Sequence, residues 1–82
     1  MWFKINDEMV NQDNVESIHH DAPHGGHIRV FAKTITGDNY MLGIFETSEQ
    51  VARFVNMIKD QIGREVIAID VTPLANLVKM QK

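Results

Sequence analysis

The chain has 82 residues, and its eight lysines and arginines stand against eleven aspartates and glutamates, a formal net charge of −3. A chain of this length has room for one hydrophobic core, so we expect a single domain over residues 1–82. The acidic balance argues against a generic nucleic-acid-binding protein, because such a protein uses a basic surface to displace counterions from phosphates. The chain has no cysteine, which excludes disulfides, thiolate metal ligands and thiol catalysis.

Targeting and membrane signals are also missing from the sequence. No segment approaches the roughly 20 apolar residues that a membrane-spanning helix requires. Residues 1–8 contain neither a basic segment nor a long apolar one, so we expect no signal peptide. These features, together with the lack of cysteine, predict a small cytoplasmic protein that binds neither membrane nor nucleic acid.

The first 45 residues have the composition of short β-strands separated by turns. We expect strands at residues 2–5, 9–11, 15–20, 27–36 and 40–45. Val15 and Ile18 are three positions apart and cannot share one face of a regular strand. We therefore expect a bulge or a single helical turn near Val15.

The clearest strand pair is the hairpin across the turn at residues 37–39. On strict alternation, one face of its first strand holds Ile28, Val30, Ala32 and Thr34, and the other holds Arg29, Phe31, Lys33 and Ile35. In its second strand, one face should hold Tyr40, Leu42 and Ile44, and the other Met41, Gly43 and Phe45. Apolar residues therefore occur on both faces of the predicted hairpin.

The hydrophobic period changes after Thr47. Apolar residues then recur at the spacing of one α-helical stripe, at Val51, Phe54, Val55, Ile58 and Ile62. Thr47 and Gln50 have the spacing of a capping box, so the helix should begin near Ser48. Gly63 suits the left-handed position that follows a helix end.

The remaining residues predict one more strand and a second helix. Residues 65–70 have β-strand composition, and Thr72 with Pro73 predicts an N-cap followed by the first residue of a short helix that ends near Lys82. The predicted order is β-β-β-β-β-α-β-α. This order indicates an α+β fold, with five to six short strands in a mainly antiparallel sheet packed by one amphipathic helix and a short C-terminal helix.

All four histidines lie within nine residues, at His19, His20, His24 and His27, with Asp21 among them. Imidazole is the commonest metal ligand, so His20, His24 and His27 form a candidate zinc or nickel site. His19 and His20 point to opposite faces of a strand and do not readily bind one ion. We expect a polar, solvent-exposed loop without a cofactor, and we keep a metal site and a pH-responsive cluster as alternatives.

Catalysis and base stacking receive little support from the sequence. Ser17, His19 and Asp21 share one face of a strand, but alternate side chains stand about 7 Å apart, too far for a hydrogen-bonded triad. We therefore expect no enzymatic activity. The aromatic residues of the predicted sheet are more typical of a small core than of a nucleotide-stacking surface; they are Trp2, Phe3, Phe31, Tyr40 and Phe45.

Three short motifs carry a resemblance to known proteins. They are residues 13–18 (Asp-Asn-Val-Glu-Ser-Ile), residues 45–49 (Phe-Glu-Thr-Ser-Glu), and Ala52 early in the predicted helix. In this layout the chain resembles short uncharacterised bacterial and prophage α+β proteins, and its first half is similar to the small flagellar FlbD-like proteins. The resemblance implies a cytosolic accessory protein of a bacterium or mobile element and brings no catalytic residue with it.

These observations predict a non-enzymatic protein-interaction or accessory module. One helix covers one face of a sheet, so apolar residues left on the other face predict an interface, and a homodimer is the commonest closed arrangement for one chain. Two alternatives remain, a metal-binding or pH-responsive protein and a small inhibitor of a host or phage enzyme. The sequence does not identify the partner.

Overall fold

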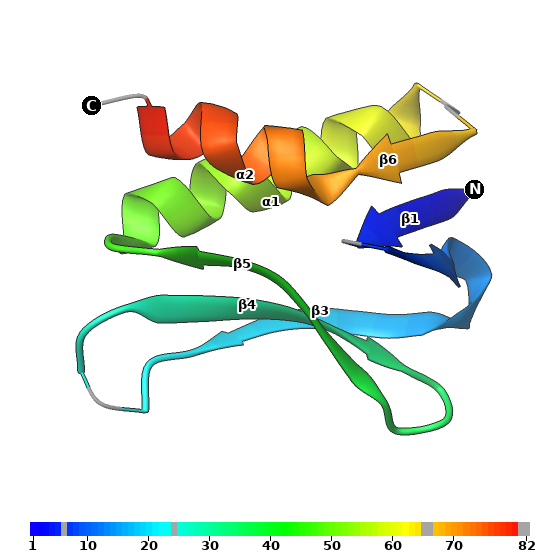
Figure 1. Ribbon diagram of the computed structural model, residues 1–82, viewed down its shortest axis with the longest axis horizontal. Coiled ribbons are helices and arrows are strands. Elements are labelled where there is room, and N and C mark those ends of the chain that lie inside the picture. The colour runs from blue at the N-terminus through cyan, green and yellow to red at the C-terminus, as the bar shows by residue number, and fades with distance from the viewer. Residues whose placement is uncertain (6, 24, 65–66, 81–82) are drawn as a thin grey trace.

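The structure, a computed structural model, describes residues 1–5, 7–23, 25–64 and 67–80. Its elements follow the predicted order (Figure 1). They are β1 (Trp2–Ile5), β2 (Glu8–Asn11), the 3₁₀ helix η1 (Gln12–Asn14), β3 (Val15–Asp21), β4 (Ile28–Thr34), β5 (Asn39–Phe45), α1 (Ser48–Gly63), β6 (Ala68–Asp70) and α2 (Val71–Met80).

The strands form two three-stranded sheets, ordered β2-β1-β6 and β3-β4-β5. All strand pairs are antiparallel except β1 with β6, which run parallel. The predicted α+β class and the mainly antiparallel pairing are thus confirmed. The helices lie side by side on one side of the β3-β4-β5 sheet (Figure 1), and this arrangement leaves the other face of that sheet uncovered in the described residues.

The irregularity predicted near Val15 is present in both expected forms. Residues 12–14 make the helical turn η1, and the Asn11 side chain accepts a hydrogen bond from the Asp13 backbone N–H at its start (3.0 Å). A bulge follows, because Val15 lies opposite Thr34 while Ser17 lies opposite Lys33. The bulge lets Val15 and Ile18 both turn toward the core, where they are half-buried.

A second bulge in β5 overturns the alternation predicted for that strand. Val30 lies opposite Gly43, and Phe31 lies opposite Met41, so Leu42 is an extra residue. The side chains that follow change faces as a result. Leu42 and Phe45 are both buried, whereas Ile44, predicted to share a face with Leu42, is 40 % exposed.

The predicted start of α1 is confirmed, and its predicted end is wrong. The Thr47 hydroxyl accepts from the Gln50 N–H (3.1 Å), and the Gln50 side chain accepts from the Thr47 N–H (3.4 Å), which completes a capping box. Gly63 is the last helical residue and is not left-handed. The Arg64 N–H bonds the carbonyls of residues 60 and 61 instead, so α1 closes without a left-handed residue.

The last strand and helix differ from prediction at their boundaries. β6 is limited to Ala68–Asp70; residues 65–66 of the predicted strand, and the predicted helix end near Lys82, lie outside the described residues. α2 begins at Val71, so Thr72 is not its N-cap. Val71 is buried in the core, and α2 follows β6 with no residue between them. Pro73 in the first turn costs no hydrogen bond, because the first four N–H groups of a helix lack intrahelical partners.

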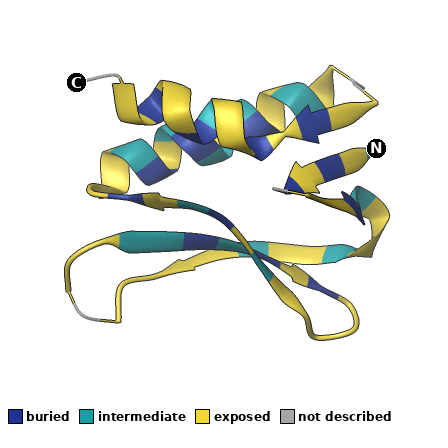
Figure 2. Ribbon diagram, in the orientation of Figure 1, coloured by how far each residue is buried: buried dark blue, intermediate teal, exposed yellow. Residues whose placement is uncertain are grey.

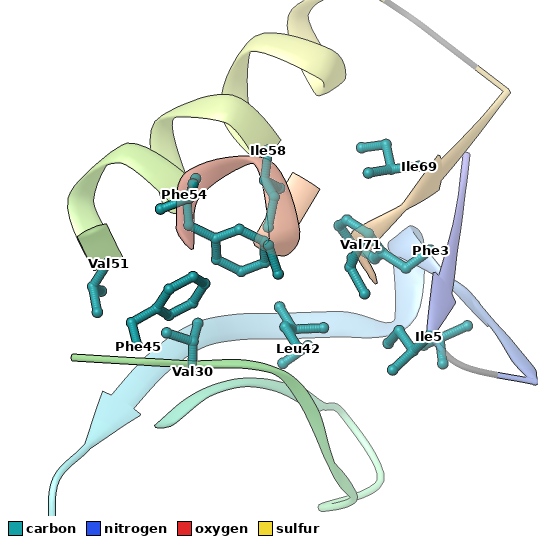
Figure 3. Packing of buried hydrophobic residues seen from close by; sticks show 14 residues of the cluster. Phe3, Ile5, Val30, Leu42, Phe45, Val51, Phe54, Ile58, Ile69 and Val71 are labelled. Carbon is teal, nitrogen blue, oxygen red and sulfur yellow. The ribbon is translucent and has the colours of Figure 1, made fainter. Parts of the chain in front are cut away.

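Both sheets and both helices contribute to one hydrophobic core (Figure 3). At its centre the rings of Phe45 from β5 and Phe54 from α1 lie 4.9 Å apart between centroids. The core residues with the least exposure and the largest side chains are Phe3, Phe45, Phe54, Ile58, Val30, Val71 and Val78. The buried stripe of α1 predicted from the sequence is confirmed at Val51, Phe54 and Ile58.

Phe54→Ala is expected to lower the free energy of unfolding by about 3–5 kcal/mol, because the ring is fully buried and its loss leaves a cavity. Asn56→Ala, on the exposed side of the same helix, is the matched control and should change it by no more than about 0.5 kcal/mol. Chemical denaturation followed by circular dichroism measures both. Equal effects of the two substitutions would contradict the buried face of α1.

Gly43 is the tightest glycine in the described chain. A Cβ at this position would lie 3.0 Å from two ring carbons of Phe45 and 3.4 Å from the Ala75 side chain. Gly43→Ala should therefore lower the free energy of unfolding by about 1–3 kcal/mol, the usual effect of overpacking. In Gly63→Ala the new methyl group meets nothing within 4 Å, so this control should leave stability unchanged or raise it by up to about 1 kcal/mol. Thermal melts of both variants check the difference in sign.

Candidate interaction surface

The face of the β3-β4-β5 sheet that points away from the helices carries a cluster of interacting side chains. We call it the outer face. The strand register assigns to it Ser17, His19 and Asp21 of β3, Arg29, Phe31 and Lys33 of β4, and Asn39, Met41 and Ile44 of β5. Figure 2 shows these strands as largely exposed or half-buried, in contrast to the buried positions that face the helices.

Asp21 and Arg29 lie directly opposite each other on β3 and β4. Arg29 donates from Nε to Oδ1 of Asp21 (2.8 Å) and from Nη2 to Oδ2 (2.9 Å), so both oxygens of the carboxylate are engaged. This hydrogen bonding raises the pKa of Arg29; desolvation opposes the rise, and the charge of Asp21 adds to it. Arg29 therefore stays a cation near neutral pH, in an orientation that the planar pair fixes.

Phe31 lies at the centre of the outer face and is in contact with one side chain of β3 and one of its own strand. The His19 ring stacks on it with centroids 5.5 Å apart and planes 24° apart. The Arg29 guanidinium lies 5.2 Å from the centre of the Phe31 ring. Nε2 of His19 donates to Oδ1 of Asn39 (3.1 Å), a bond that reaches across the sheet from β3 to β5. Five side chains thus hold one another in place.

Two apolar side chains from β5 lie on the same face as this cluster. Met41 is 42 % exposed and lies opposite Phe31, and Ile44 is 40 % exposed and lies opposite Arg29. The outer face therefore combines an aromatic and guanidinium centre with exposed apolar side chains.

The structure separates the histidines that the sequence placed together. His19 belongs to the outer face, whereas His20 lines a hollow against α1 on the inner side of β3. His27 precedes β4 and lines a hollow beside Ile44, and His24 lies outside the described residues. Within the described ranges, no three His, Cys, Asp or Glu side chains gather closely enough to hold a metal. The zinc or nickel site at His20, His24 and His27 remains a prediction.

The expected assignment of the aromatic residues to the core is correct only in part. Phe3 and Phe45 are buried, but Trp2 is 41 % exposed, and Phe31 is half-buried on the outer face. The alternation of β4 already placed Phe31 beside Arg29. Its contact with His19 depends on the pairing register of β3, which no local pattern in the sequence indicates.

Comparisons with known proteins identify no relative of this chain. No protein-family model matches the chain, and neither a curated protein nor a solved structure matches it. In the part of the chain that the structure describes, both helices are too short or too polar to cross a bilayer.

Replacing all four histidines by asparagine is expected to change the free energy of unfolding by no more than about 0.5 kcal/mol, because the described ones are exposed. Melts of the untagged protein with added zinc, with added nickel and with a chelator provide the measurement. A stoichiometric metal whose loss lowers the melting temperature of the wild type, but not of the variant, would favour the metal site instead.

Proposed function

We propose that the protein is a non-enzymatic interaction module that binds another protein through the outer face of its β3-β4-β5 sheet. The observation that carries this proposal is the cluster of Arg29, Phe31 and His19, which hydrogen bonds and ring contacts join beside the exposed side chains of Met41 and Ile44. Aromatic residues, arginine and methionine are enriched at protein interfaces, where a few packed anchors supply most of the binding energy.

The fixed geometry of the cluster supports binding in a second way. Ordering a free arginine or histidine at an interface costs conformational entropy. Here Asp21 already orients Arg29, and Asn39 already orients His19, so part of that cost is met before a partner binds. Lys33 and Ser17 lie on the same face and add polar side chains beside the cluster, as in the polar rim of an interface.

Protein is a better-supported partner than nucleic acid. A base that stacked on Phe31 would have to displace His19 or Arg29, both of which already contact the ring. Asp21 also neutralises Arg29 on a chain whose net charge is already −3. A phosphate backbone would therefore meet little free positive charge here.

The wider assignment follows the resemblance predicted from the sequence. We place the protein in the cytoplasm as an accessory protein of a bacterium or mobile element. Inhibition of a host or phage enzyme is the special case in which the partner is an enzyme.

The double substitution Met41→Asp, Ile44→Asp is expected to weaken partner binding by at least about tenfold, because it places charges in an apolar contact. A photocrosslinking amino acid at Lys33, used in cells of the native host, identifies the partner, and titration calorimetry with that purified partner measures affinity. Leu77→Asp is the matched control, since Leu77 is 47 % exposed on α2, which lies on the other side of the sheet. An equal loss of affinity in the control would contradict the assignment to the outer face.

A further inference from the structure

Two adjoining hollows lie between β2 and the place where β4 turns into β5, at the end of the molecule that holds the β1-β2 hairpin (Figure 1). The first has a volume of about 320 Å³, and its lining includes Trp2 and Asp38. The second has a volume of about 300 Å³, and its lining includes Glu8 and Met41. Tyr40 lines both hollows, and we call the two together the Tyr40 cleft.

The Tyr40 cleft contains carboxylates but no cationic side chain among the described residues that line it. Asp38 lines the first hollow, and Asp7 and Glu8 line the second. The ion pairs within the described residues all involve other carboxylates. The hollows beside α1, α2 and β4 differ, because each is lined by a lysine or an arginine. A cleft lined by one sign of charge attracts the opposite sign, so this cleft favours a cationic ligand.

Aromatic and apolar side chains narrow the class of cation. Trp2 is 41 % exposed, Met9 is 52 % exposed and Ile35 is 66 % exposed, while Tyr40 is half-buried. Aromatic rings attract cations to their faces, and exposed apolar surface suits an aliphatic stem. Arginine supplies both parts, because its guanidinium stacks on rings and binds carboxylates, and its stem is apolar. A hydrated metal ion would leave the apolar part of the lining uncovered.

The turn between β4 and β5 holds Asp38 in place and leaves part of its carboxylate available. Thr34 is buried, and its hydroxyl accepts a hydrogen bond from the Asp38 N–H (3.2 Å). The Thr36 hydroxyl donates to Oδ2 of Asp38 (3.1 Å). Oδ1 accepts no hydrogen bond from the described residues, so it can accept one from a ligand.

We infer that the Tyr40 cleft binds an arginine-rich segment of a partner protein. The cleft has two hollows, each with its own carboxylate, on either side of one aromatic ring. A segment with several arginines matches this layout, whereas a single small cation fills one hollow only. In the complex, guanidinium groups bind Asp38 and Glu8, and an arginine side chain packs on Tyr40.

The cleft and the outer face are different surfaces. They share only Asn39 and Met41, which border both. The inference therefore goes beyond the proposed function and does not rest on it. The outer-face variant Met41→Asp, Ile44→Asp should bind an arginine peptide at least as tightly as the wild type, because it removes no carboxylate from the cleft.

The experiment uses the fluorescence of Trp2, which is the only tryptophan of the chain and lines the first hollow. The probe is a hexa-arginine peptide, and the control probe is the same peptide with citrulline, a neutral isostere of arginine, at every position. The arginine peptide should change the Trp2 emission saturably, whereas the citrulline peptide should leave it unchanged. Free argininamide should bind at least about tenfold more weakly than the peptide, because it cannot fill both hollows at once.

The double variant Glu8→Gln, Asp38→Asn tests the carboxylates. It should raise the dissociation constant of the arginine peptide by about tenfold, because it removes both charges with little change in shape. Glu16→Gln, Glu49→Gln is the matched control, since it changes the net charge equally at exposed positions of β3 and α1 outside the cleft. The control should change the dissociation constant by less than about twofold.

A pair of substitutions at Tyr40 tests the aromatic ring. Tyr40→Leu should weaken binding of the arginine peptide by about threefold, because the face of the ring is lost. Tyr40→Phe keeps the ring and should bind as the wild type does. Circular dichroism melts check that every variant folds, and the carboxylate variant decides if Tyr40→Leu does not.

Each outcome decides for or against the cleft. Saturable binding that depends on its carboxylates and on the Tyr40 ring supports the inference. An unchanged Trp2 emission, equal binding of the citrulline peptide, or an equal loss of affinity in the control variant overturns it. Argininamide that binds as tightly as the peptide overturns the assignment to a protein segment. A failure of the outer-face proposal changes none of these results.

Discussion

The packing of Phe45 on Phe54 is the contact on which the rest of the architecture depends. It joins the β3-β4-β5 sheet to α1. Phe45 reaches the core only because the bulge at Leu42 shifts the faces of β5, and the missing side chain of Gly43 leaves space for the ring beside Ala75 of α2. This packing holds both helices on one side of the β3-β4-β5 sheet. The outer face is therefore left uncovered.

The parts of the fold that could be predicted from the sequence are those that local chemistry determines. The capping box at Thr47 and the stripe through Phe54 specify α1, and the three-residue spacing of Val15 and Ile18 indicates the first bulge. The second bulge could not be predicted, because Tyr40, Leu42 and Ile44 alternate regularly and nothing in the local sequence indicates a bulge. It follows from the tertiary need to bury Leu42 and Phe45 together. The division into two sheets likewise depends on pairing between distant strands.

The candidate surface was predictable only in its composition. Strand alternation predicts Arg29, Phe31 and Lys33 on one face, but aromatic residues in a small chain are more often core, so the sequence favours a core position for Phe31. Its position became clear only with the register that sets His19 against Phe31 and Asp21 against Arg29. Register is a property of two paired strands, and a single sequence contains little information about it. The histidines are close together in the sequence, but the register of β3 places His19 and His20 on opposite faces of the sheet, and His27 lies beside Ile44.

The parallel pairing of β1 with β6 brings Trp2 beside Ala68, nearly the full length of the chain away. Contacts between such distant residues form late, because a long loop has to close first. During synthesis on the ribosome, β1 can pair with β2 and β3 with β4 and β5 as these strands emerge, but the other edge of β1 must wait for β6. Phe3 and Ile5, buried in the finished protein, stay open to water in that interval. The β1-β2 hairpin is therefore the part of the core whose apolar side chains are covered last.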